Sequence, residues 1–254
     1  MPSFKITLAY DGTDFVGWQR QANGVSIQGL IEDALADLEG RPVAVAGAGR
    51  TDAGVHALGQ VAGFSLERSI EPIAVLRALN ARLPDSVRVL RAETVDPGFH
   101  PRFAARAKRY EYRIWNAPIA NPFERRFVWH ILEPLDIDAM MTAARIVEGR
   151  HDFAAFQSAG SAATTTERTV FSSSLSPAVV DLRGLEAGER LVTYEISGDG
   201  FLRHMVRAIV GSLVEVGRGR RQPEWIGDVM ATGDRGAAGP TAPPEGLFLV
   251  DVTY

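Results

Sequence analysis

The chain has 254 residues, 46% hydrophobic and 23% charged, which excludes wholesale disorder and suffices for one large or two modest folded domains. It contains no cysteine, which excludes disulfide scaffolds, thiolate metal sites and cysteine catalysis, and its net charge of −4 does not point to nucleic acid. No cationic and apolar leader opens the sequence, and no stretch approaches the roughly 18 apolar residues of a membrane span, so a cytoplasmic protein is expected.

The first part of the chain alternates between strand and helix patterns. Side-chain alternation predicts strands at 4–10 and 86–95, and short apolar runs predict strands at 42–46 and 60–66. Ser26 is a favourable N-cap for a helix that ends at Gly40, and helical spacing predicts a second helix at 72–83. The resulting order, β-α-β-β-α-β, is that of a ferredoxin-like unit.

Turn-forming residues at 97–106 predict a boundary, so we expect one domain at 1–104 and a second at 105–254. In the second half, the patterns predict strands at 109–115, 169–180, 190–197 and 247–254, and helices at 136–148, 201–216 and 222–232. Small and polar residues indicate a mobile loop at 159–166. The fold class expected for the whole chain is α+β.

Positive charge is concentrated in two segments. Residues 102–126 carry a net charge of +5 and residues 203–221 a net charge of +4, which leaves −13 for the rest of the chain. Such segregation makes a basic surface on an acidic body, as a polyanion site requires, although charged runs also occur as plain solvated surface.

The least ordinary segment is residues 48–57, which joins two predicted strands. Glycines at 49 and 54 flank Arg50, Thr51 and Asp52, so the loop can approach a large ligand closely and present the carboxylate of Asp52. The nearby Arg50 can keep that carboxylate ionised or bind a phosphate. The alternative is a surface turn that Asp52 merely caps.

Other motifs are missing. Asp52 stands where a dinucleotide-binding fingerprint would need its third glycine, and no phosphate-binding loop with its lysine occurs. The five histidines are not spaced as metal ligands, so each is expected to be an ordinary surface or core residue.

Residues 49–56, Gly-Arg-Thr-Asp-Ala-Gly-Val-His, resemble the signature of the tRNA pseudouridine synthase A family. Further resemblances follow in family order at residues 10–12, 17–21, 99–103, 201–207 and 245–247. The resemblance implies two ferredoxin-like halves around a shared, mainly antiparallel sheet with a central cleft. It also implies a homodimer that converts uridine to pseudouridine in the anticodon arm of tRNA, without metal or organic cofactor.

The resemblance also implies roles for individual residues. Asp52 is expected to be catalytic, attacking C6 of the base or C1′ of the sugar or assisting elimination at C2′, and the sequence does not choose among these. Arg50 is expected to enter the space left by the flipped uridine, Tyr110 to stack on the extruded base, and Arg207 to pair with Asp52. The expected tRNA contacts are Gln60, Phe99, His100, Arg102 and Phe103.

Plainer interpretations exist for the same residues. Tyr110 can also be an ordinary aromatic residue of a core or edge strand, and Arg207 can be an ordinary solvent-facing cation on a helix. Two rival functions are a non-catalytic RNA-binding module with the same element order and a small-molecule hydrolase that uses Asp52 and His56. The aromatic sheet signature of the RNA-binding module is missing from residues 42–66.

Overall fold

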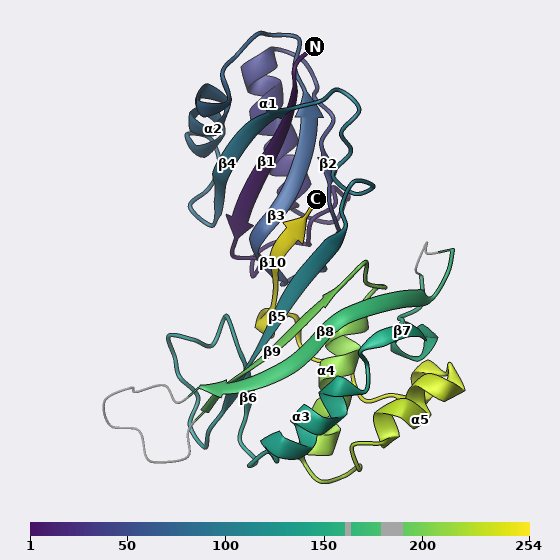
Figure 1. The fold of residues 1–254 in the computed structure, drawn as a ribbon. Helices are drawn as coiled ribbons and strands as arrows, with labels where there is room; N and C mark the ends of the chain where they lie inside the picture. The colour runs from purple at the N-terminus through teal and green to yellow at the C-terminus, as the bar shows by residue number, and fades with distance from the viewer. Residues whose placement is uncertain (161–163, 179–189) are drawn as a thin grey trace. The chain divides into compact units, whose positions relative to one another are not determined.

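The computed structural model describes residues 1–160, 164–178 and 190–254. The chain divides into two compact units, described here one at a time (Figure 1). Unit 1 comprises Met1–Arg106 together with Phe248–Tyr254, and unit 2 comprises Ala107–Leu247. Unit 1 is therefore built from two segments that are distant in sequence.

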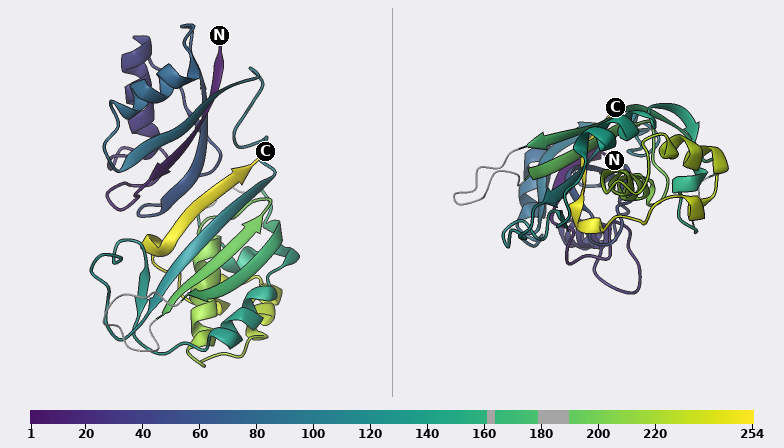
Figure 2. Two further views of the ribbon diagram at one scale, coloured as in Figure 1. Left: turned by 60° about the vertical axis from the view of Figure 1, so that its left-hand side comes forward. Right: turned by 90° about the horizontal axis from the view of Figure 1, so that it is seen from below.

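Unit 1 is a mainly antiparallel sheet with two helices on one face (Figure 2). Its elements are β1 (Ser3–Tyr10), α1 (Ile27–Glu39), β2 (Ala46–Gly47), β3 (His56–Ser65), α2 (Pro72–Asn80), β4 (Val87–Val95) and β10 (Leu247–Thr253). The strand order is β4-β1-β3-β10, and β2 also pairs with β3. Strand β10 is parallel to β3, and the other pairs are antiparallel. Alternate residues of β1 are buried together with the apolar stripe of α1, which makes the core of the unit.

The ends of α1 follow directly from its sequence. The Ser26 hydroxyl accepts a hydrogen bond from the amide of Gly29, and Gly40 adopts the left-handed conformation (φ +81°) that closes the helix. Both capping residues were expected from the sequence, and the expectation is confirmed.

Unit 2 contains further strands of the ten-stranded sheet that the described residues form, together with helices. Its elements are β5 (Ala107–Asn116), β6 (Trp129–Ile131), α3 (Ile137–Arg145), β7 (Gly149–Asp152), β8 (Glu167–Ala178), β9 (Arg190–Gly198), α4 (Met205–Gly217) and α5 (Trp225–Thr232). Short 3-10 helices lie at Ala154–Phe156, Arg235–Ala237 and Pro244–Gly246. Neighbours in the order β5-β9-β8-β7 are antiparallel, and β6 runs parallel to β5. Helix α4 is buried along most of its length.

The α+β class and most predicted elements are confirmed, and several details differ. In place of the strand expected at 42–46, only the two-residue strand β2 forms. Strand β3 begins at His56 rather than at Gln60. The helix expected from residue 201 begins at Met205. The short strands β6 and β7 were not expected. The terminal strand, expected in the second half from the sequence, pairs in parallel with β3 of unit 1. The loop expected at 159–166 and the strand end expected at 179–180 lie partly outside the described residues.

Among the described residues, no helix is both long and apolar enough to span a membrane.

Candidate active site

The segment expected to carry the chemistry is a loop of unit 1 between β2 and β3. Hydrogen bonds to neighbouring segments hold its backbone: the amide of Ala48 donates to the carbonyl of Val61 (2.8 Å), and the carbonyl of Thr51 accepts from the amide of Trp18 (3.0 Å). Thr51 is buried, whereas Asp52 is half-buried and Arg50 is exposed. The backbone of the loop is thus hydrogen-bonded to neighbouring segments, while the side chain of Arg50 is exposed and that of Asp52 is half-buried.

Directly after Asp52 the chain makes a tight turn. The amide of Val55 donates to the carbonyl of Asp52 (3.1 Å), and Gly54 adopts φ +77°. A side chain at position 54 would be strained in this conformation, which explains the glycine of the motif. The turn returns the chain at once into β3.

Gln60, expected to contact tRNA, is completely buried. Its side-chain amide donates to the carbonyl of Gly49 (3.0 Å) and to the hydroxyl of Tyr10 (3.4 Å). Gln60 therefore holds the loop through hydrogen bonds from the protein interior. Its side chain does not face solvent, so the structure gives no support for a direct contact with RNA.

His56 is buried at the start of β3, as the core interpretation of the histidines predicted. Its Nδ1 accepts a hydrogen bond from the amide of Gly12 (2.9 Å), and its ring stacks on Phe248 at 4.7 Å. A buried imidazole held in this way does not offer a base beside Asp52, which removes the basis of the hydrolase alternative.

Residues 99–103 form a compact turn of unit 1. The amide of Ala104 donates to the carbonyl of His100 (3.0 Å), and the ring of Phe103 lies 4.4 Å from that of His100. Phe103 is 78% exposed, and the guanidinium of Arg102 lies 5.9 Å from its ring centre. The turn thus presents an aromatic surface flanked by a cation, as a base-stacking contact requires.

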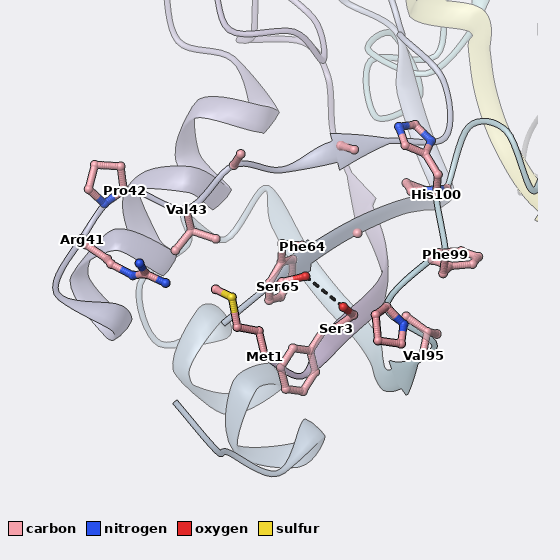
Figure 3. A pocket seen from close by; sticks show the side chains of 16 residues that line it. Met1, Ser3, Arg41, Pro42, Val43, Phe64, Ser65, Val95, Phe99 and His100 are labelled. Carbon is pink, nitrogen blue, oxygen red and sulfur yellow. Dashed lines mark hydrogen bonds between the residues drawn. The ribbon is translucent and has the colours of Figure 1, made fainter. Parts of the chain in front are cut away.

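A pocket of about 400 Å³ lies beside this turn, between residues 41–46 and 95–101 (Figure 3). Phe99 and His100 line one side, and Arg41 lines the other. Phe99 packs against Tyr254 (5.1 Å between ring centres), and Arg41 forms an ion pair with Glu67 (2.6 Å). The positive charge in the pocket is therefore already balanced within the protein.

Two expected site residues, Tyr110 and Arg207, belong to unit 2. Tyr110 lies on β5, pairs with Ile196 of β9, and meets the ring of Phe201 edge-on at 5.1 Å. Arg207 lies on α4, where its Nε donates to the carbonyl of Ala242 (2.7 Å) and its own carbonyl accepts from the amide of Ala242 (3.0 Å). The pairing of Arg207 with Asp52 of unit 1 and the stacking of Tyr110 on the flipped base stay predictions.

One residue beside Arg207 was missed on sequence. His204 precedes α4 with φ +61°, and among the described residues it alone has a positive φ without being glycine. Its Nδ1 is hydrogen-bonded to the hydroxyl of Ser158 (2.8 Å), and the neighbouring Arg203 donates to the carbonyl of Ala159 (2.9 Å). No sequence pattern reveals this strain, since histidine at a helix start carries no conformational signal.

Among the residues that the structure describes, no three acidic or histidine side chains are grouped as metal ligands. A family model described as tRNA pseudouridine synthase matches residues 6–104 and 143–254. The chain belongs to the tRNA pseudouridine synthase family. The match includes both Asp52 and Arg207, whereas Tyr110 lies in the intervening stretch.

Full-length relatives of this family agree with the match. Proteins named tRNA pseudouridine synthase A are 45% identical in Pelobacter propionicus and 48% identical in Solibacter usitatus, and each alignment covers the whole of both chains. The protein of the same name in Myxococcus xanthus is 45% identical over all of this chain and 92% of its own length. The similarity to the family therefore extends through the stretch that contains Tyr110.

Proposed function

We propose that this protein isomerises uridine to pseudouridine in tRNA, with Asp52 as its catalytic residue. The observation that carries the proposal is the similarity, along the entire chain, to proteins named tRNA pseudouridine synthase A. The loop geometry supports it, since a half-buried carboxylate on a well-anchored loop suits a catalytic group.

The reaction breaks the bond between C1′ of the ribose and N1 of uracil and joins C1′ to C5 of the same base. No group enters or leaves, and nothing is oxidised. A carboxylate can serve by adding to C6 or to C1′, or by assisting elimination at C2′, and each route uses the same position of Asp52.

The target base must leave the RNA stack before Asp52 can reach it. Unstacking costs a few kcal/mol, which contacts to the flipped nucleotide must offset. In our proposal the exposed Arg50 occupies the vacated space, Tyr110 stacks on the base, and Arg207 keeps the carboxylate of Asp52 charged.

The wider RNA contacts and the assembly are part of the same proposal. We assign the tRNA substrate to its anticodon arm, with the turn at residues 99–103 as a contact outside the catalytic loop. We also propose a cytoplasmic homodimer in which each chain forms two ferredoxin-like halves around a shared sheet and a central cleft. The strand order β4-β1-β3 with β2 on the far side of β3 supports the first half of this architecture.

The proposal is tested by incubating the purified protein with an unmodified tRNA transcript and mapping pseudouridine along it. The wild type should modify the anticodon arm, with and without EDTA. Asp52→Asn should fold and bind the transcript but lose activity by on the order of 10³-fold or more, since it retains the shape of the carboxylate without its charge. Unaltered activity of this variant would refute the assignment of Asp52.

A non-catalytic RNA-binding module remains the second candidate. It is separated by the same experiment, because such a module binds the transcript while the wild-type protein forms no pseudouridine in it.

A further inference from the structure

The segment Tyr10-Asp11-Gly12, at the end of β1, reaches the catalytic loop on both sides of Asp52. Tyr10 contacts the residue just before Asp52, and Gly12 contacts His56, four residues after it. These two contacts therefore join the end of β1 to both flanks of Asp52.

The contact before Asp52 is made by a buried hydroxyl. Tyr10 Oη lies 2.8 Å from Thr51 Oγ1, and both residues are buried. Gln60 Nε2 donates to the same phenol oxygen at 3.4 Å, which favours donation by the phenol hydroxyl to Thr51. A polar chain from Gln60 through Tyr10 to Thr51 therefore underlies the loop and fixes the residue that precedes the carboxylate.

The contact after Asp52 is made by an imidazole. His56 Nδ1 accepts the amide proton of Gly12 at 2.9 Å and lies 3.3 Å from Asp11 Oδ1, so the imidazole contacts two successive residues after β1. A Cβ atom at position 12 would lie 2.0 Å from the carbonyl oxygen of Val55, so only glycine permits this approach.

Asp52 thus lies on a short span whose two flanks are fixed to one strand end. We propose that Tyr10 and His56 are positioning residues, which hold residues 51–56 so that the carboxylate of Asp52 keeps one orientation toward the uridine. This inference rests on the proposed function. A displacement of a catalytic group by about 1 Å can lower the reaction rate about 10²-fold. The two buried hydrogen bonds made by Tyr10 and His56 can therefore affect the rate by holding Asp52 in place.

The state of the phenol fits this task. Burial raises the pKa of Tyr10 to about 12, so the hydroxyl keeps its proton at any pH at which tRNA is handled. The contact consequently acts as a fixed support throughout an activity assay.

The test compares kcat and KM on a tRNA transcript for variants that remove one contact at a time. Tyr10→Phe and Thr51→Val should each lower kcat about tenfold and leave KM within about twofold, because binding groups stay in place. Thr51→Ser, which keeps the hydroxyl, should retain nearly full kcat. On the other flank His56→Leu should lower kcat, and His56→Asn, whose amide oxygen can replace Nδ1, should restore most of it.

Two controls separate positioning from general loss of stability. Tyr194 of unit 2 makes an equivalent buried contact, 2.8 Å from Ser173 Oγ, so Tyr194→Phe removes a similar hydrogen bond elsewhere. It should lower thermal stability as Tyr10→Phe does and leave kcat unchanged. The double variant Tyr10→Phe/Thr51→Val should have the kcat of the slower single variant, because both changes remove the same hydrogen bond between Tyr10 and Thr51.

Hydrogen exchange of the peptide 49–56 gives a readout that needs no activity. It should accelerate in Tyr10→Phe and Thr51→Val and stay unchanged in Tyr194→Phe. Three results would each overturn the positioning role. In Tyr10→Phe and Thr51→Val these are an unchanged kcat with unchanged exchange, or a rise in KM alone. The third is an equal loss of kcat in Tyr194→Phe. If the wild type forms no pseudouridine, the proposed function fails, and the exchange comparison alone decides whether these residues hold the loop.

Discussion

At the scale of single residues, unit 1 separates side chains that face solvent from those that hold the backbone. Arg50, Arg102 and Phe103 are exposed, whereas Tyr10, His56 and Gln60 are buried around the catalytic loop. The two groups should respond differently to substitution. Changes in the first group should alter RNA binding, and changes in the second should alter stability and turnover.

Phe103 provides a test of the first group. Removing its ring with Phe103→Ala should weaken tRNA binding about tenfold, because stacking on one base is worth about 1–3 kcal/mol. The Kd is measured by filter binding or fluorescence anisotropy. Ile73→Ala, which removes another exposed apolar side chain in unit 1, should leave the Kd unchanged. Equal effects of the two variants would contradict the stacking role.

Tyr10 provides a test of the second group through pH. Its pKa is raised by burial to about 12, whereas tyrosine in the unfolded chain ionises near 10. The unfolded state therefore gains more from ionisation above pH 10. The free energy of unfolding should fall as the pH rises from about 10 to about 12, with on the order of 3 kcal/mol from this residue.

Urea unfolding at pH 8, 10.5 and 11.5 measures this loss. Tyr112, Tyr194 and Tyr254 also have raised pKa values through burial, so the wild type should lose stability for several reasons. Tyr10→Phe should lose measurably less between pH 8 and 11.5 than the wild type does. An identical loss in both proteins would contradict the burial of an un-ionised phenol at this position.

Residue roles were only partly accessible from the sequence. The loop that carries Asp52 could be predicted, because flanking glycines and a polar triplet between strands are typical of a loop. The burial of Gln60 could not, because an amide in a strand shows no preference for either face until its partners, here Gly49 and Tyr10, are known.

At the scale of elements, the helices show which boundaries a sequence can specify. Helix α1 begins and ends at capping residues that act through local chemistry, and its bounds were predicted. Helix α4 begins four residues later than its apolar pattern suggested, because His204 adopts a left-handed conformation. In that conformation His204 is hydrogen-bonded to Ser158, which is 46 residues away.

His204 therefore makes a prediction for α4. His204→Gly should be more stable than His204→Ala by about 1 kcal/mol, since alanine is strained in the left-handed region and glycine is not. Thermal unfolding measures the difference. Inside the same helix alanine is preferred over glycine, so Ala208→Gly should destabilise the protein by about 1 kcal/mol or more. A more stable alanine variant at 204 would show that the conformation carries no strain.

At the scale of the whole molecule, the pairing of β10 with β3 makes unit 1 discontinuous. Phe248 pairs with His56 and Leu249 with Ala57, although 192 residues separate the members of each pair. Alternation predicted that β10 is a strand, but no local pattern specifies a partner at such a distance. The expected domains at 1–104 and 105–254 included no pairing between β10 and β3.

Deletion of residues 248–254 tests the dependence of unit 1 on this strand. The deletion should speed hydrogen exchange in β3 and in the loop at 48–55, because His56 loses its stacking partner. Exchange in the paired strands β8 and β9 of unit 2 should change little. Phe248→Ala, which keeps the backbone pairing, should show a smaller change of the same kind. Uniform acceleration in both units would contradict a local role of β10.

The same return of the chain orders events during translation. The ribosome completes the loop that contains Asp52 long before it synthesises Phe248, so a nascent chain carries this loop without the aromatic ring that covers His56. A polypeptide released early by a stalled ribosome would lack that ring permanently. Synthesis of the chain as far as Phe248 must therefore precede the stacking of Phe248 on His56.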